Sequence, residues 1–230
     1  MKKQYIYTYA IFITGIIVFL YIVLKRFENF QDTLIPTFHI LIATAGRVSL
    51  KNLLDSLKDE LTERDAITVV FDGADAFTKS TYEDSWINEH KSRVSVIVQH
   101  DNTGFWGHPI RQKYVSLLSP KTTYIMHADD DDQYISGSFN TLRQLCIEPE
   151  TLYIAKMNYS KSPGRIVPRQ NTKIIEADIG NPNGIVPFDL SPKGQWGMSG
   201  VGDFDYYNTL QHNAKRIVFL DTIIYTVNER

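Results

Sequence analysis

The chain has 230 residues, of which 43% are hydrophobic and 12% aromatic, and its formal net charge at pH 7 is −2. This length and apolar content predict one globular domain with a sizeable core and exclude a disordered chain. The near-neutral charge excludes a general attraction to nucleic acid, so a polyanionic ligand has to be held by local basic residues or a metal ion. The single cysteine, Cys146, excludes an internal disulfide.

The N-terminal segment from Gln4 to Leu24 contains no charged residue, and lysine or arginine flanks it on both sides. A helix over it would be about 30 Å long, enough to cross a hydrocarbon core. No small-residue cleavage site of a signal peptide is visible. We therefore predict a single-pass membrane anchor over residues 1–26 and a tether over residues 27–36; a buried globular helix is the alternative. The flanking positive charges nearly balance, which leaves the side of the membrane open.

Residues 37–230 alternate strand-like and helix-like stretches, the pattern of one α/β layered domain with a mostly parallel sheet flanked by helices. Short apolar runs predict four strands, over residues 37–43, 66–71, 93–99 and 122–128. Leucines at helical spacing predict a helix over residues 49–61. A proline at the first position favours another helix over residues 109–118.

The second half of the chain contains a long segment rich in glycine, proline and asparagine. Two strands around a Ser-Pro-Gly turn are predicted over residues 151–160 and 164–169. Residues 176–202 are predicted to form a long loop, which in compact domains is often a lid or a binding loop. A helix over residues 203–213 and two short strands over residues 216–227 close the chain.

Polar side chains follow each of the four predicted strands of the first half. They are Thr44, Arg47, Asp72, Asp75, Asp101, Asn102 and Asp129 to Asp132. Ligands of open α/β sheets bind outside the carboxyl ends of the strands, so these residues are predicted to converge on one binding rim. The alternative is that wet loops follow strands in any protein, which explains the polarity but not the density of acids.

The run from Asp129 to Asp132 places four carboxylates in succession at a strand end. Like charges at this spacing repel one another unless a cation or a solvated turn relieves them. Mg²⁺ and Mn²⁺ are usually held by one or two carboxylates, with phosphates and water as the other ligands. The run therefore predicts Mn²⁺ or Mg²⁺ as cofactor beside a nucleotide diphosphate; a solvated acidic turn or an adventitious calcium site is the alternative.

Five stretches of the sequence, in this order, resemble the GT-A glycosyltransferases and most closely the family 2-like enzymes: HILIATAGR, VVFDG, NTGFWGHPIRQKY, YIMHADDDDQY and GDFDYYNTL. The similarity covers nearly all of residues 37–230. GHPIRQKY and ADDDDQY are also similar, more weakly, to small glycosyltransferases of large DNA viruses that decorate capsid proteins. The resemblance implies a GT-A, Rossmann-like domain over residues 37–230, a nucleotide-sugar donor and a glycan or glycoprotein acceptor.

The resemblance also implies which residues contact the donor. They are Thr44, Ala45 and Arg47 in the first loop, Asp72 beside the base, Arg111 and Lys113 near the phosphates, and Asp129 and Asp130 near the ribose. For the two basic residues an ordinary solvated helix face is the alternative.

Relatives carry either an aspartate pair or an Asp-x-Asp triplet before an aromatic residue, and both registers fit this chain. Counting back from Tyr134, the pair is Asp130 and Asp131, whereas the triplet is Asp130 and Asp132. The resemblance therefore implies metal ligands among Asp130, Asp131 and Asp132, with Asp131 or Asp132 as the main one.

Inverting sugar transfer needs a general base that deprotonates the acceptor hydroxyl. In relatives this acid opens a helix after a flexible loop, often as Glu-Asp, whereas this chain reads GDFD. Gly202 thus replaces the glutamate, and Asp203 matches the aspartate and is the candidate base, with Asp205 as a supporting acid. The alternative is that Asp203 caps the helix and favours its dipole.

Two tryptophans lie near the predicted site, Trp106 in the loop after the third strand and Trp196 before the helix that Asp203 opens. Their faces suit sugar rings, although core packing is the alternative for both. His127 is predicted to be a packed side chain within a strand. His108 and His212 are weaker candidates for the site than the two tryptophans.

The leading hypothesis is a membrane-anchored, metal-dependent hexosyltransferase-type enzyme that uses a nucleotide-diphosphate sugar and inverts the anomeric centre. A sugar-nucleotide pyrophosphorylase is the second candidate, but it requires a glycine-rich, lysine-bearing loop where this chain has TAGRVSL. The third candidate is a membrane-tethered, non-catalytic binding or scaffold protein with a structural calcium site.

Overall fold

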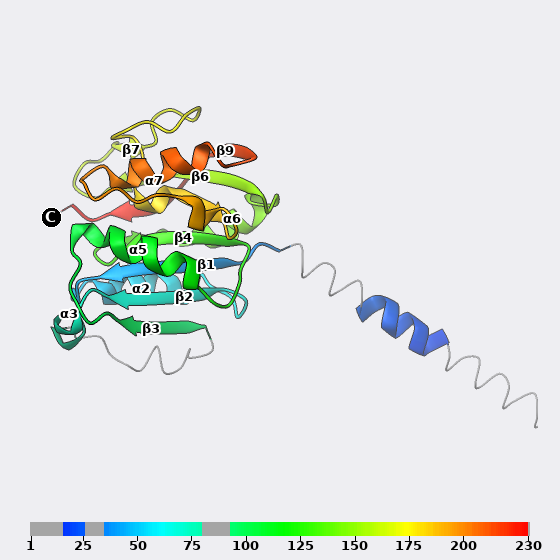
Figure 1. Ribbon diagram of the computed structural model, residues 1–230. Helices are drawn as coiled ribbons and strands as arrows, with labels where there is room; N and C mark the ends of the chain where they lie inside the picture. Colours follow the sequence, from blue (N-terminus) through cyan, green and yellow to red (C-terminus); the bar gives the residue numbers. More distant parts are fainter. Residues whose placement is uncertain (1–15, 26–34, 80–92, 230) are drawn as a thin grey trace, which may run out of the picture. The chain divides into compact units, whose positions relative to one another are not determined.

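The computed structural model describes residues 16–25, 35–79 and 93–229 (Figure 1). The chain divides into two compact units, Met1–Ile35 and Pro36–Arg230. In the first unit, residues 16–25 form a helix with exposed side chains, and the rest of the predicted anchor lies outside the described residues. Among the described residues, no helix has both the length and the apolar character needed to cross a bilayer. The membrane anchor therefore stays a prediction.

The second unit contains a sheet whose first half is parallel (Figure 1). Its strands are β1 (Phe38–Thr44), β2 (Ala66–Phe71), β3 (Val94–Val98) and β4 (Tyr124–Asp129), in the order β3-β2-β1-β4. These are the four strands predicted from the apolar runs. Ala43 pairs with Asp129 and Thr44 with Phe71, so the carboxyl ends of the strands lie level at one edge.

The second half of the sheet is mixed. It continues through β8 (Gly184–Pro187), β6 (Thr151–Tyr159), β9 (Arg216–Val227) and β5 (Gln133–Tyr134), with β7 (Ile166–Val167) paired to β6. Only the β6–β9 pair is parallel here; β4–β8, β6–β8, β6–β7 and β5–β9 are antiparallel. The predicted mostly parallel sheet is thus confirmed for the first half and wrong for the second.

Two elements of the second half differ from the prediction. β8 lies inside the segment that was predicted to be a long loop. It was not predicted because a four-residue strand that ends in proline shows no alternation of apolar and polar residues. The predicted pair of short strands at the C-terminus is one strand, β9. Its pairing with β6 is irregular between Phe219 and Ile223, a stretch that contains the polar Asp221.

The helices of the second unit that the structure describes are short, at six to ten residues each. They are α2 (Leu50–Lys58), α3 (Ala74–Lys79), α5 (His108–Tyr114), α6 (Ser138–Leu145) and α7 (Gly202–Gln211), with 3-10 turns η1 (Phe105–Gly107), η2 (Val115–Leu117), η3 (Asn181–Asn183) and η4 (Ser191–Lys193).

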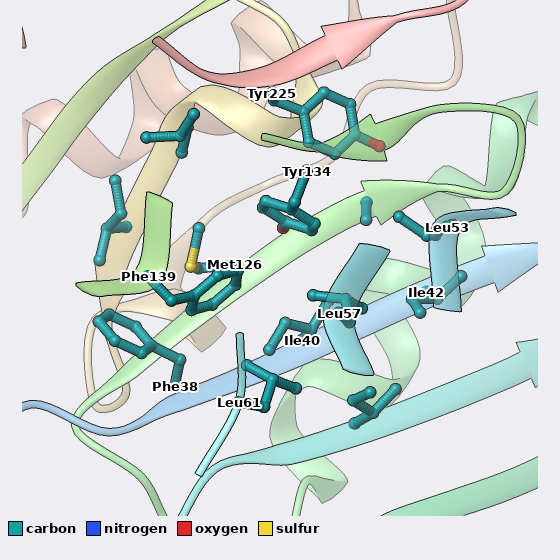
Figure 2. Packing of buried hydrophobic residues seen from close by; sticks show 14 of the residues in the cluster. Phe38, Ile40, Ile42, Leu53, Leu57, Leu61, Met126, Tyr134, Phe139 and Tyr225 are labelled. Carbon is teal, nitrogen blue, oxygen red and sulfur yellow. The ribbon is translucent and has the colours of Figure 1, made fainter. Parts of the chain in front are cut away.

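Helices cover both faces of the parallel half because its central strand is apolar on both sides. Figure 2 shows Ile40 and Ile42 of β1 beside Leu53 and Leu57 of α2. The alternate residues of β1 point to the other face, where Leu41 packs in one cluster with residues of α5. Each fully buried leucine or isoleucine contributes about 1.5–3 kcal/mol, so this packing fixes the edge from which the site is built.

His39 is fully buried in β1. Its Nε2 accepts from the Thr68 hydroxyl at 2.8 Å, and its Nδ1 donates to the Pro120 carbonyl oxygen at 3.3 Å. Burial lowers the pKa of His39 from 6.5 to about 4. Between about pH 6.5 and pH 4, His39 therefore binds a proton in the unfolded chain but not in the folded protein.

Above about pH 6.5, His39 should have no effect on how the free energy of unfolding depends on pH. On acidification to pH 4, the protonation of His39 in the unfolded chain should lower the free energy of unfolding by about 3 kcal/mol. We expect His39→Gln, which cannot titrate, to lose less stability than wild type between pH 7 and pH 4.5. Urea unfolding at both pH values measures this. Equal losses in the two proteins would show that His39 does not contribute to acid sensitivity.

Candidate active site

A cavity of about 540 Å³ opens at the level edge of the parallel strands. Nearly all residues predicted to form the site line it: Thr44, Ala45, Arg47, Asp72, Arg111, Asp129, Asp130, Asp131, Asp132 and Asp203. They come from the last residues of β1 and β4, from the segments that follow β1, β2 and β4, and from the first turns of α5 and α7. The predicted convergence of these strand ends is therefore found in the structure.

Lys113 and Asp205, predicted to contact the donor and to support the base, do not line the cavity, and neither do Asp75 and Asp101 of the predicted rim. The Lys113 ammonium lies 3.3 Å from Gln99 Oε1 and 4.9 Å from the centroid of the Tyr114 ring. The Asp205 carboxylate lies against Gly197, where an added Cβ would be 1.8 Å from Asp205 Oδ2. Each follows a cavity residue by two positions on a helix, and such residues point to nearly opposite sides.

Asp130 links the end of β4 to the loop after β1. Its Oδ2 accepts from Thr44 Oγ1 at 2.6 Å and from the Ala45 N–H at 3.1 Å, and its Oδ1 forms an ion pair with Arg47. The side chain is 1% exposed. Because both carboxylate oxygens are engaged by the protein, Asp130 shapes the loop that was predicted to contact the donor. Asp130 is common to both registers of the metal motif, so the choice between the registers depends on Asp131 and Asp132.

Asp131 and Asp132 occupy the turn after β4 and are held from the C-terminal end of the chain. The N–H of Asn228 donates to Asp132 Oδ1 at 2.8 Å, and its side-chain amide donates to the Asp131 carbonyl oxygen at 2.9 Å. Asp131 Oδ2 lies 3.7 Å from Arg47 Nη1. The sequence did not indicate Asn228, which reaches this turn only through the pairing of β9.

Burial, and next the charge of Asp129, raise the pKa of Asp132 to about 8. A buried carboxylate disfavoured in its charged form gains most from a cation beside it. The hard oxygen donors of Asp131 and Asp132 therefore fit Mg²⁺ or Mn²⁺. Within residues 16–25, 35–79 and 93–229, no three acidic, histidine or cysteine side chains form a ready-made metal cage.

Asp72 orders the loop between β3 and η1. Its Oδ1 accepts from the N–H and the hydroxyl of Thr103 at 2.7 and 2.8 Å, and its Oδ2 accepts from the Gly104 N–H at 2.9 Å. Asn102 and Gly104 of this loop line the cavity together with Asp72. The predicted contact of Asp72 with a nucleotide base stays a prediction.

Arg111 is buried and joins three parts of the cavity wall. Its Nη1 donates to the Trp106 carbonyl oxygen at 2.6 Å, and its Nη2 donates to Asp129 Oδ1 at 2.5 Å. Asp129 Oδ1 also accepts from the Asn181 side-chain amide at 3.1 Å. The guanidinium thus pairs with Asp129 and fixes the turn before α5, and its predicted phosphate contact stays a prediction.

The turn at Phe105–Gly107 is strained. Phe105 and Trp106 have φ values of 47° and 53°, a region that residues other than glycine rarely adopt. Gly107 has a φ of 77°, and a Cβ there would lie 2.6 Å from Ala43 Cβ, so only glycine lets the turn rest on β1. This backbone holds Trp106 at the cavity with 70% of its surface exposed. Strain of this kind concentrates at functional sites.

The two tryptophans therefore have different environments. Trp196 is 5% exposed and stacks on Tyr206 with ring centroids 4.3 Å apart, so it is a core residue. His127 is fully buried and packs edge-to-face against Trp196, which confirms its prediction as a packed side chain. Trp106 keeps an open aromatic face beside the cavity.

Asp203 lies in the first turn of α7 and contacts two other segments. Its Oδ2 accepts from the Asn181 N–H at 3.0 Å, and its Oδ1 lies 3.4 Å from His108 Nε2. The N-cap of α7 is Val201, without a side-chain cap hydrogen bond. Asp203 therefore does not cap the helix through its side chain, although the helix dipole still favours its charge. Sequence reasoning gave His108 little weight and did not identify Asn181.

Neither a known family model nor a curated protein sequence matches the chain. Solved structures are similar to it. TarS from S. aureus in complex with UDP-GlcNAc is 19% identical, with a TM-score of 0.61 over 84% of this chain and 59% of that one. The mannosyltransferase PcManGT from Pyrobaculum calidifontis, in complex with GDP-Man and Mn²⁺, is 11% identical, with a TM-score of 0.62 over 84% and 56%. GalNAc-T7 with UDP, GalNAc and Mn²⁺ is 10% identical, with a TM-score of 0.63 over 85% and 44%.

These similarities define the fold class. The structural neighbours are GT-A glycosyltransferases, and the chain has the GT-A fold that its motifs predicted. The match spans less than two thirds of each of those longer chains. At identities below 20% the shared property is the fold, so the activity has to be argued from the site.

Proposed function

We propose that the protein is a metal-dependent glycosyltransferase that transfers a sugar from a nucleotide-diphosphate sugar to an acceptor hydroxyl. The observation that carries this proposal is one cavity lined both by Asp131 and Asp132 and by Asp203. A leaving diphosphate and an attacking hydroxyl require these two chemistries in one place. The ligands of the three similar structures, UDP-GlcNAc, GDP-Man with Mn²⁺, and UDP and GalNAc with Mn²⁺, support this donor class.

On the donor side, Asp131 and Asp132 would hold Mn²⁺ or Mg²⁺. Such an ion neutralises negative charge on the leaving diphosphate. Arg47, whose side chain is 39% exposed beside these acids, adds a positive charge close to the same place. The loop after β1, which Asp130 orders, and the loop between β3 and η1, which Asp72 orders, provide the backbone surface on which the nucleotide lies.

On the acceptor side, Asp203 removes the proton from the attacking hydroxyl. The hydroxyl oxygen forms a bond to the anomeric carbon as the bond from that carbon to the diphosphate oxygen breaks, which inverts the configuration. The Asn181 N–H fixes one carboxylate oxygen of Asp203, so the base is oriented before the acceptor binds. Asn181 also contacts Asp129 and thereby couples the base to the end of β4.

Trp106 is proposed to bind a sugar ring of the acceptor on its open face. Trp106→Ala should then raise the acceptor KM about five- to tenfold, equivalent to about 1–1.4 kcal/mol, while nucleotide affinity stays unchanged. Initial rates over a range of acceptor concentrations, with calorimetric titration of the nucleotide, measure both quantities. Trp106→Phe is the matched control and should keep most of the affinity. An unchanged acceptor KM in Trp106→Ala would place the acceptor elsewhere.

The proposal is tested with the full chain and a panel of nucleotide-diphosphate sugars in the presence of Mn²⁺. Binding of at least one nucleotide diphosphate, with release of that nucleotide from its sugar donor, is the expected result. A protein that binds the metal but none of UDP, GDP and dTDP would instead be a scaffold with a structural cation. Formation of a nucleotide sugar from a nucleoside triphosphate and a sugar 1-phosphate would identify a pyrophosphorylase.

A further inference from the structure

We infer that His108 is a positioning residue for Asp203 and that the two side chains together hold the proton taken from the acceptor. This inference rests on the proposed function and deepens it, because it identifies how the base of the same site is built. The carrying observation is the contact of 3.4 Å between His108 Nε2 and Asp203 Oδ1, from α5 to α7.

The hydrogen bond on the other side of the ring fixes the tautomer of His108. Its Nδ1 lies 2.8 Å from the carbonyl oxygen of Gly197. A carbonyl oxygen can only accept, so Nδ1 carries the hydrogen and the neutral ring has a lone pair on Nε2. This lone pair faces a carboxylate oxygen of Asp203. Two acceptors at this distance repel, and one proton between them turns the repulsion into attraction.

The surroundings of His108 prevent the ring from turning away. The residue is 4% exposed and stacks on Trp196, with ring centroids 5.3 Å apart and an interplanar angle of 28°. A Cβ at Gly202 would lie 2.3 Å from His108 Nδ1 and 2.4 Å from the Gly197 carbonyl oxygen. Position 202 therefore accepts only glycine. The imidazole thus occupies the space that a side chain at position 202, where the Glu-Asp pattern has its glutamate, would enter.

Other charged and titratable groups lie near this pair, among them Asp129, whose pKa is raised chiefly by burial and also by the charge of Asp203. Arg111 lies over the Trp196 ring, 5.4 Å from its centroid, and is paired with Asp129. His127 packs against Trp196, and burial lowers the pKa of His127 well below its usual value, so this ring is neutral. Asp203 is the acid in direct contact with His108.

The proton balance of the proposed step is complete. The acceptor O–H bond breaks, its electron pair forms the new bond to the anomeric carbon, and the diphosphate leaves with the electron pair of the broken bond. The proton passes to Asp203 Oδ1 and is shared with His108 Nε2. Because the lone pair of His108 Nε2 faces Asp203 Oδ1, the two atoms can hold one proton between them, which Asp203 alone has no partner to share.

Two substitutions of His108 separate proton sharing from packing. His108→Asn keeps an amide donor near the position of Nδ1 and so retains the bond to Gly197, whereas His108→Gln places an amide near the position of Nε2 beside Asp203. Neither side chain can take up a proton. We expect both variants to bind nucleotide diphosphate as wild type does and to lose about 10- to 100-fold in kcat, a part of the usual contribution of a general base.

The pH profile gives the readout that packing alone would not change. The rate of wild type should fall on acidification as the pair is protonated, and in both variants this acid limb should move to lower pH because only a carboxylate remains. A wild-type kcat and an unmoved acid limb in His108→Gln would overturn the inference.

Nuclear magnetic resonance of the histidine rings tests the pair without any turnover. His108→Gln identifies the signal, whose nitrogen shifts should report hydrogen on Nδ1, and Asp203→Asn should change the shift of Nε2, the nitrogen that faces the substituted side chain. An unchanged Nε2 shift would overturn the inference even in an active enzyme. A coupled pair in a protein that transfers no sugar would instead contradict the proposed function.

Discussion

Replacement of Asp203 by asparagine is expected to lower kcat for sugar transfer by about 10²- to 10⁴-fold, the usual contribution of a general base. The amide is isosteric and still accepts from the Asn181 N–H, so the fold and the affinity for nucleotide diphosphate should be unchanged. Steady-state kinetics with saturating donor and acceptor, together with calorimetric titration of the nucleotide, measure both quantities.

Asp205 provides a matched control on the same helix. It is the same residue type two positions further on, but its carboxylate packs against Gly197 and does not line the cavity. Asp205→Asn should therefore retain kcat within about threefold, because a side chain outside the cavity makes no contact with the transition state. Full activity in Asp203→Asn, or an equal loss in both variants, would remove Asp203 from the role of base.

Removal of the divalent cation is expected to abolish transfer, and addition of Mn²⁺ to the chelated protein should restore it. Asp132→Asn should raise the Mn²⁺ concentration needed for half-maximal activity about 10- to 100-fold, because the amide supplies no negative charge to the ion. Activity measured across a Mn²⁺ titration tests both statements. Equal activity in excess EDTA would exclude the metal role.

The same substitution should have the opposite effect on the stability of the metal-free protein. The folded-state pKa of Asp132, about 8, exceeds its usual 3.8, so the folded protein binds a proton that the unfolded chain releases. Wild type therefore loses stability as pH rises from about 4 to 8, by at most about 5 kcal/mol, and Asp132→Asn does not.

Asp130→Asn is the control for this stability effect. Its carboxylate accepts from Thr44 and Ala45 and pairs with Arg47, so its replacement should destabilise the metal-free protein by about 1–3 kcal/mol. Thermal unfolding at pH 8 without metal should thus show opposite signs for the two variants. The same sign for both would contradict the separate roles of Asp130 and Asp132.

Much of the fold could be predicted because β1, β2 and β4 are buried on both faces, and such strands appear as continuous apolar runs. The edge strand β3 is largely exposed, but its valines and isoleucine gave the same kind of apolar run, so it was located as well. β8 was missed because its four residues carry no periodic signal, and its place between β4 and β6 depends on pairing with distant strands. Because β8 pairs antiparallel with both β4 and β6, missing it also led to the wrong prediction of a mostly parallel second half.

The sequence alone determined which residues stand at the carboxyl ends of the strands, because strand length and chain order place them there. It could not divide the work among them, since that depends on contacts between distant segments. Asp130 is tied to Thr44 across 86 positions, and Asp132 to Asn228 across 96.

The same reason explains the base. GDFD indicated Asp203, but its neighbours His108 and Asn181 belong to other segments and meet it only when α5, η3 and α7 pack together. On a helix, residues two positions apart point to nearly opposite sides, so Lys113 and Asp205 point away from the cavity that Arg111 and Asp203 line. Spacing therefore located the acids, and the packing of helices against the sheet edge decided which of them face the cavity and what each one contacts.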